Sequence, residues 1–211
     1  MKIIPAILRE SLAGVRQDLA ALGGASDLVS IDLCDGKFVP SQTWLPNQET
    51  PANIFQEFNF SLEFDLLVSE PLIYLDFLKK IGAKKVVIHT DDSEVIRQSL
   101  DFCQKHALEL GLVSQDFKVL KKFAGQINYI QLMGIEKLGY QKQPFLEESL
   151  EKIKTIRNFY GGIIQIDGGL NLLNIKKCLQ AGANNFVLGS EIFSSGNPKE
   201  NYQRIILALN E

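Results

Sequence analysis

The sequence predicts a closed barrel of eight parallel strands, each followed by a helix, in one domain over residues 1–211. Short apolar runs alternate with longer stretches of helical periodicity, the runs number eight, and polar residues recur where the runs end. An open doubly wound sheet is the rival architecture. The count of strands and their polar ends favour the closed form, the (β/α)8 or TIM barrel, whose active sites lie at the strand ends.

The expected strands are the apolar runs, which are rich in β-branched residues. In chain order they cover residues 2–7, 27–33, 60–67, 84–89, 108–113, 127–133, 162–166 and 184–188. Helices are expected between them, with the clearest at 72–80, 93–105, 147–159, 171–180 and 201–209. In the third of these, Leu150, Ile153 and Ile156 repeat at helical spacing on one face.

Size and composition are those of an ordinary soluble globular protein, with 45% hydrophobic and 22% charged residues in a chain of 211. The net charge of −3 gives no electrostatic basis for nucleic acid or an acidic membrane as partner. Three cysteines lie too far apart in sequence for a metal motif, and their odd number argues against a disulfide framework. The apolar start is too short for a signal peptide or a membrane span, so a cytoplasmic protein is expected.

Two aspartates are the candidate catalytic residues, because each ends an apolar run and is followed closely by glycine. They are Asp32 in the second run and Asp167 in the seventh. Side chains alternate faces along a strand, so the polar set of each run should face the barrel axis while the apolar set faces the helices. On this reasoning Asp65 should join the two aspartates near the mouth, with Glu63 one layer deeper.

Several carboxylates in one partly dry site must share protons, bind a cation or be countered by a base. Two carboxyl groups on opposite sides of a carbon atom can remove a proton from one face and return one to the other. The structural alternative is that a single Asp at a strand end caps the turn that follows. For Asp35, which stands beside Gly36, this turn role is the interpretation we adopt.

Five segments resemble the ribulose-phosphate 3-epimerase family, and the likeness runs over nearly the whole chain. The most specific is Asp32-Leu33-Cys34-Asp35-Gly36-Lys37-Phe38-Val39-Pro40, which resembles the family's Asp-Val-Met-Asp-Gly-His-Phe-Val-Pro. The others are residues 5–8, 62–68, 166–169 and 181–193. The resemblance implies a barrel of the ribulose-phosphate-binding type and a role in carbohydrate metabolism. It also implies inversion of carbon 3 of a pentulose 5-phosphate, with Asp32 and Asp167 as acid and base.

Departures from the family pattern concern the metal ion that the resemblance implies. The family holds its metal with two His and two Asp, and the two His positions are Ser30 and Asp65 here. If a metal binds, its ligands are Asp32, Asp65 and Asp167, an all-oxygen set that favours Mg, Mn or Ca over Zn. A site without metal is the alternative that the sequence leaves open.

Binding of the substrate is expected at positions that match the family's phosphate and sugar contacts. The glycines Gly168 and Gly169 and the pair Gly189-Ser190 are expected to receive the phosphate, since glycine lets backbone N–H groups approach it. Further candidates for substrate contact are Met133, His89 and Lys137. For His89 a packed histidine is the alternative, and for Lys137 a solvated loop lysine.

Other family positions have changed. The substrate-contacting Ser is Ala6, two sugar-flanking methionines are Cys34 and Leu67, and the glycine-rich loop after the sixth strand reads Glu136-Lys137-Leu138-Gly139-Tyr140-Gln141. Three functions therefore stay open: an epimerase for a phosphorylated ketose, a catalytically impaired sugar-phosphate-binding protein, and an isomerase or lyase for another sugar phosphate. The expected partner is a small sugar phosphate, with no nucleic acid and no membrane. A homo-oligomer is also open, with Trp44, Leu45 and Phe55 as candidate contact residues.

Overall fold

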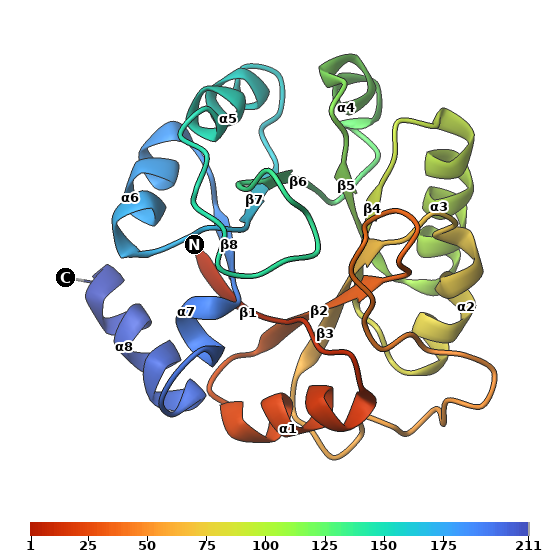
Figure 1. The fold of residues 1–211 in the computed structure, drawn as a ribbon. Coiled ribbons are helices and arrows are strands. Elements are labelled where there is room, and N and C mark those ends of the chain that lie inside the picture. The colour runs from red at the N-terminus through yellow and green to blue at the C-terminus, as the bar shows by residue number, and fades with distance from the viewer. Residues whose placement is uncertain (211) are drawn as a thin grey trace.

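The computed structural model describes residues 1–210, and its eight strands form one closed, all-parallel barrel in the order β1 to β8. Figure 1 shows this ring with helices outside it. The strands are β1 (Lys2–Ile7), β2 (Leu28–Cys34), β3 (Ser61–Leu67), β4 (Lys85–His89), β5 (Glu109–Val113), β6 (Tyr129–Met133), β7 (Ile163–Asp167) and β8 (Asn185–Leu188). The closed barrel is confirmed over the open sheet, because β1 pairs with both β2 and β8.

Eight helices surround the barrel within residues 1–210 (Figure 1). They are α1 (Leu12–Leu22), α2 (Leu72–Lys80), α3 (Ser93–His106), α4 (Phe117–Phe123), α5 (Ser149–Arg157), α6 (Leu172–Ala181), α7 (Ser190–Phe193) and α8 (Pro198–Asn210). The prediction of a helix after every strand is wrong at β2. Residues 35–60 run from β2 to β3 through turns, and Pro40, Pro46 and Pro51 interrupt any helical stretch there.

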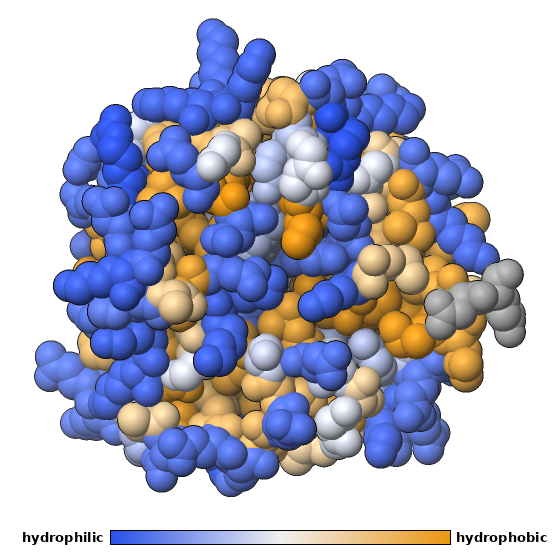
Figure 2. Space-filling view, turned by 180° about the vertical axis from the view of Figure 1, so that it is seen from behind, coloured by the Kyte–Doolittle hydropathy of each residue, from blue (hydrophilic) through white to orange (hydrophobic). Residues whose placement is uncertain are grey.

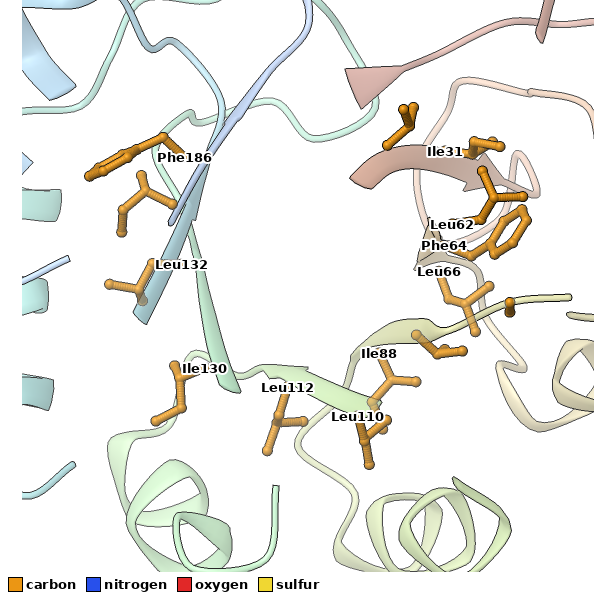
Figure 3. Close-up of a cluster of buried hydrophobic side chains, with 14 of the residues drawn as sticks. Ile31, Leu62, Phe64, Leu66, Ile88, Leu110, Leu112, Ile130, Leu132 and Phe186 are labelled. Carbon is orange, nitrogen blue, oxygen red and sulfur yellow. The ribbon is translucent and has the colours of Figure 1, made fainter. Parts of the chain in front are cut away.

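Alternation along the strands separates an apolar outer layer from a polar interior, as predicted. Ile31, Phe64 and Leu112 belong to the large core between strands and helices, and Figure 3 shows their side chains on the outer side of the strands. The inward positions of β2 and β3 hold Ser30, Asp32, Glu63 and Asp65 instead. The helices therefore cover apolar side chains, and the barrel interior is left for polar groups.

The segment after β2 is held at the mouth by Asp35, in the turn role that the sequence predicts. Its carboxylate accepts hydrogen bonds from the backbone N–H of Lys37 and Phe38, at 2.8 and 2.9 Å. It also accepts two from Ser69, beyond the end of β3. Partial burial opposes ionisation of Asp35, but the hydrogen bonds from Ser69, Phe38 and Lys37 outweigh it and lower the pKa to about 2.

Of the three apolar residues expected to mark a subunit contact, Phe55 is buried, which corrects that expectation for it, whereas Trp44 and Leu45 are half-buried. The ring of Trp44 meets that of Phe55 edge-on at 5.8 Å between centroids. Leu45 also packs against the main core. Much of the apolar surface of these three residues is therefore used within the chain.

Seen from behind, the surface is mostly hydrophilic, with smaller groups of apolar residues between charged ones (Figure 2). No helix among the described residues is both long and apolar enough to cross a membrane. All three cysteines are buried and unpaired, which agrees with the absence of a disulfide framework.

Candidate active site at the carboxyl ends of the strands

Asp32 and Asp167 line one small cavity of about 50 Å³ at the carboxyl ends of the strands. β2 delivers Asp32 and β7 delivers Asp167, each on an inward position. The same cavity is lined by five other residues that the sequence singled out, Met133, Gly168, Gly169, Gly189 and Ser190. The structure thus brings together both candidate catalytic residues and the glycines expected to receive a phosphate.

The two carboxyl groups disfavour each other's ionisation. Burial is the main cause that raises the pKa of Asp32 well above its ordinary value, and the charges of Asp167, Asp65 and Glu63 raise it further. Burial also raises the pKa of Asp167, together with Asp65 and Glu63, against a lowering hydrogen bond from the backbone of Gly168. Like charges in a low-dielectric site cannot all ionise, so the pair favours a state with a proton on one member.

Asp32 also has an unmet polar atom. Its Oδ1 is buried and has no hydrogen-bond partner among the described residues. A buried oxygen without a partner is costly, by about 1–3 kcal/mol, unless something outside the chain satisfies it. The atom lies in a side chain that lines the cavity, so a bound ligand is the natural partner.

Below this cavity, both carboxylate oxygens of Glu63 accept hydrogen bonds from side chains of β6 and β7, across the barrel. Tyr129 donates its hydroxyl to Glu63 at 2.8 Å, and Gln165 donates its amide to the other carboxylate oxygen at 2.8 Å. Gln165 also donates to the amide oxygen of Gln131 at 2.8 Å. Burial raises the pKa of Glu63 despite the hydrogen bonds from Tyr129 and Gln165, which lower it. The deeper position predicted for Glu63 is confirmed.

Asp65 is joined to this buried chain of polar groups and to His89. The Nε2 atom of His89 lies 2.6 Å from Asp65 Oδ1, and Gln131 donates to Asp65 Oδ2 at 2.7 Å. Both side chains of the Asp65–His89 pair are almost completely buried, at 2% and 3% exposure. Asp65 stands beside Asp32 in the register of β2 and β3, but it does not line the cavity that holds Asp32 and Asp167.

Asp32, Asp65 and Asp167, the metal ligands that the sequence left open, are not arranged to bind a divalent cation. Both oxygens of Asp65 already accept a hydrogen bond from a neighbouring side chain. Within residues 1–210, no group of three or more His, Cys, Asp or Glu is arranged to hold a metal ion. The donor set therefore differs in kind from that of a divalent cation site, which gathers several oxygen ligands around one point.

The connection from β6 to α5, residues 134–148, arches across the centre of the mouth (Figure 1). Its Leu138 packs against the small cluster of Cys34, Val39 and Leu67 at the inner edge of the mouth. Burial raises the pKa of the Cys34 thiol to about 12, so this cysteine is an apolar packing group rather than a nucleophile.

Sequence reasoning did not assign Ile135 or residues 139–143 of this connection to the cavity, yet these residues, among them Tyr140, Gln141 and Lys142, line it with the two aspartates. The Gln141 amide lies so close to Gly189 that a Cβ there would come within 3.0 Å of its Nε2. Lys142 has a positive φ of 60°, which is uncommon for a residue other than glycine. The only sequence signal was the departure of this loop from the glycine-rich family pattern, and that signal does not say which side chains face inward.

Two predicted substrate contacts lie outside the cavity. Lys137 lines a groove on the outer side of the connection, with Phe38 and Pro40. His89 lines a separate pocket at the ends of β3, β4 and β5. The structure does not bring these two side chains to the glycines expected to bind phosphate.

The architecture and site define a class: a parallel eight-stranded barrel with paired acidic residues and glycine-rich turns at the carboxyl ends of its strands. Within that class, a sequence model described as the Ribulose-phosphate 3 epimerase family matches residues 2–193. The chain belongs to the ribulose-phosphate 3-epimerase family.

Curated relatives are similar over most of their length but distant in sequence. A ribulose-phosphate 3-epimerase of Chlamydia muridarum is 27% identical, with 95% of this chain and 94% of the relative covered. That of Bacillus subtilis is 24% identical, with 95% of each covered. The family is shown by the match over residues 2–193, and identity near this level leaves the reaction of this chain to be argued from its own residues.

Solved structures share the fold. KGPDC from Streptococcus mutans in complex with D-R5P has a TM-score of 0.76 at 13% identity, covering 99% of this chain and 96% of that one. A 3-hexulose-6-phosphate synthase has a TM-score of 0.74 at 16% identity, covering 99% and 100%. At these identities the similarity concerns the barrel and not the chemistry.

Proposed function

We propose that this protein is an epimerase for a phosphorylated ketose, with Asp32 and Asp167 as the acid/base pair. The observation that carries the proposal is the shared cavity, in which both aspartates and four phosphate-candidate residues lie together. The family membership supports the same substrate class.

The proposed step is a proton transfer at the carbon next to the ketone. The ionised aspartate removes the proton, the C–H electron pair moves into the carbonyl to form an enediolate, and the protonated aspartate returns a proton to the opposite face. This step needs one carboxylate and one carboxylic acid at the same pH. Repulsion between the two groups favours this arrangement, because an ionised Asp167 raises the pKa of Asp32 and so keeps the proton on it. No part of this step is assigned to a metal ion, because the donor set does not fit one.

Phosphate binding is proposed for the turns after β7 and β8. Gly169 has a φ of +68°, and a Cβ on it would come within 2.7 Å of the backbone of Phe145, so only glycine is accommodated there. The missing side chains at Gly168, Gly169 and Gly189 let the β6–α5 connection pack closely on these turns, through Ile135, Phe145 and Gln141. Lys142, which lines the same cavity, supplies a positive charge for the phosphate.

The connection over the mouth must move for substrate to enter. Small-molecule pockets usually measure roughly 300–1,000 Å³, whereas the cavity between the aspartates measures about 50 Å³. Residues 134–148 supply much of its wall, and withdrawal of Tyr140 and Gln141, which line it, would open it. Closure after binding would exclude water from the enediolate.

A direct test follows the substrate's proton in deuterated water. We expect purified protein to exchange the hydrogen on carbon 3 of D-ribulose 5-phosphate, observed by proton NMR, and to form the carbon-3 epimer. The Asp32→Asn variant should bind the compound without exchange. A wild-type protein that binds ketose phosphates but exchanges no proton would instead favour the impaired, sugar-phosphate-binding alternative, for which the altered positions Ala6 and Ser30 are the supporting observation.

A further inference from the structure

A second pocket lies on the other half of the mouth, where β3, β4 and β5 end. Its volume is about 410 Å³, which is within the usual range for small-molecule pockets. Polar groups in its wall come from Ser69, His89, Thr90, Asp91, Ser114 and Gln115. None of these residues takes part in the proton transfer proposed above.

His89 is the residue that marks this pocket as a binding site. Its side chain is nearly buried and is fixed on one side by the 2.6 Å contact between Nε2 and Asp65. The other ring nitrogen, Nδ1, is buried without a partner in the part of the chain that the structure describes. The imidazole also lines the pocket and meets the Phe38 ring edge-on at 5.8 Å.

The charges around the pocket define the chemistry of its ligand. No Lys or Arg is found among the described residues that line it, and the carboxylate of Asp91 is part of the wall. That carboxylate accepts a hydrogen bond from the Ser114 hydroxyl. A phosphate or carboxylate would meet repulsion here, whereas an uncharged group rich in hydroxyls would find several donors and acceptors.

The two pockets are connected through the packing of one residue of the β6–α5 connection. Leu138 lines the second pocket and also packs on Cys34, Val39 and Leu67 at the edge of the first cavity. Withdrawal of the β6–α5 connection would therefore join both pockets into one site, with the glycine turns at one end and His89 at the other.

We propose that the second pocket receives the uncharged, hydroxyl-bearing end of the sugar phosphate, with His89 Nδ1 hydrogen-bonded to a substrate oxygen. Asp65 is then a positioning residue, which acts by holding the imidazole through Nε2. This inference rests on the proposed function, because it concerns the opposite end of the same substrate.

The chain contains two histidines, which makes a direct spectroscopic test practical. His106 ends α3 and packs against the Phe102 ring at 4.5 Å between centroids, and it lines neither pocket, so it serves as an internal control. In ¹⁵N-labelled protein we expect D-ribulose 5-phosphate to shift the Nδ1 resonance of His89 and leave His106 unchanged, whereas inorganic phosphate should shift neither. In Asp65→Asn the Nε2 resonance of His89 should already differ without ligand. A His89 resonance that does not respond to saturating ribulose 5-phosphate would overturn the inference.

A matched pair of surface variants tests the pocket without altering the histidine. Gln115→Trp places a large ring at the pocket wall, and Gln126→Trp places the same ring on an exposed position that lines neither pocket. Using calorimetry, we expect Gln115→Trp to weaken ribulose 5-phosphate binding at least tenfold with phosphate binding unchanged, and Gln126→Trp to match wild type.

The outcomes separate the two proposals. If wild type binds neither ribulose 5-phosphate nor phosphate, the proposed function fails and the pocket inference with it. If wild type binds both and Gln115→Trp binds both equally well, only the pocket inference fails.

Discussion

Two sets of acidic residues share the interior of this barrel, and their surroundings differ. Glu63 and Asp65 accept hydrogen bonds from side chains of other strands on both carboxylate oxygens. Asp32 keeps a buried oxygen without a partner, and both it and Asp167 face a cavity. A buried carboxylate with hydrogen bonds on both oxygens is held rigidly and serves the structure. A buried carboxylate with an unpaired oxygen beside a cavity can instead bind a ligand or exchange a proton with it.

The partners explain the difference. Tyr129, Gln131 and Gln165 project inward from β6 and β7 at the level of Glu63 and Asp65, and their donors reach across the barrel axis. One layer higher, the corresponding inward residue of β6 is Met133, which brings no N–H or O–H group. The aspartates at the mouth therefore keep their capacity for a ligand.

The largest expected effect distinguishes the mouth aspartates from the deeper pair. Asp32→Asn or Asp167→Asn should lower proton exchange by roughly 100- to 10,000-fold, the usual contribution of one general acid or base. Thermal unfolding should occur at the same or a higher temperature, since a repelled buried charge has been removed. If either variant lost stability and activity together, the aspartate would be structural.

The deeper pair should respond in the opposite way. Glu63→Ala leaves the Tyr129 hydroxyl and the Gln165 amide without their acceptor, and we expect about 3 kcal/mol less free energy of unfolding, measured with urea. Glu151→Ala, at a side chain 76% exposed, is the matched control and should change stability by less than about 0.5 kcal/mol. Equal stability of the two variants would contradict the structural role of Glu63.

The pH dependence sharpens the comparison further. Burial raises the pKa of Asp32 and Asp167 above the ordinary 3.8, so the folded protein binds more protons than the unfolded chain once pH exceeds that value. Below pH 3.8 the two groups make their full contribution to the free energy of unfolding. This contribution is lost as the pH rises through their pKa values in the folded state. The Asp32→Asn/Asp167→Asn double variant should lack this loss, so its advantage in melting temperature should grow with pH. An advantage that stays constant or shrinks would be inconsistent with raised pKa values.

The smallest expected effect concerns metal ions. Treatment with EDTA, or addition of Mn²⁺ or Zn²⁺, should leave the melting temperature unchanged, because a ligand that does not bind the folded state cannot stabilise it. The Ser30→His/Asp65→His variant restores both imidazoles of the family's ligand set and should gain a metal-dependent increase. A metal-dependent increase in wild type would show that Asp32, Asp65 and Asp167 rearrange into a cation site.

Local patterns in the sequence determined the strands, the faces and the acidic residues. Strand bounds were predicted to within two residues, because apolar runs and period-two alternation are properties of neighbouring residues. The turn role of Asp35 was also predictable, since its backbone partners lie two and three residues away. The missing helix after β2 was not anticipated, although its prolines were visible.

Only the tertiary structure decided which side chains became partners and where the connections lie. Gln165 donates to Glu63 although the two residues lie 102 positions apart in the sequence, and His89 contacts Asp65 from 24 positions away. A pattern among neighbouring residues does not determine contacts at such separations. Similarly, Gln141 and Lys142 face the cavity while Lys137, a few residues earlier, lines an outer groove. The alternation of a strand is imposed by backbone geometry, but the path of a connection depends on what it packs against, and that is known only once the barrel has closed.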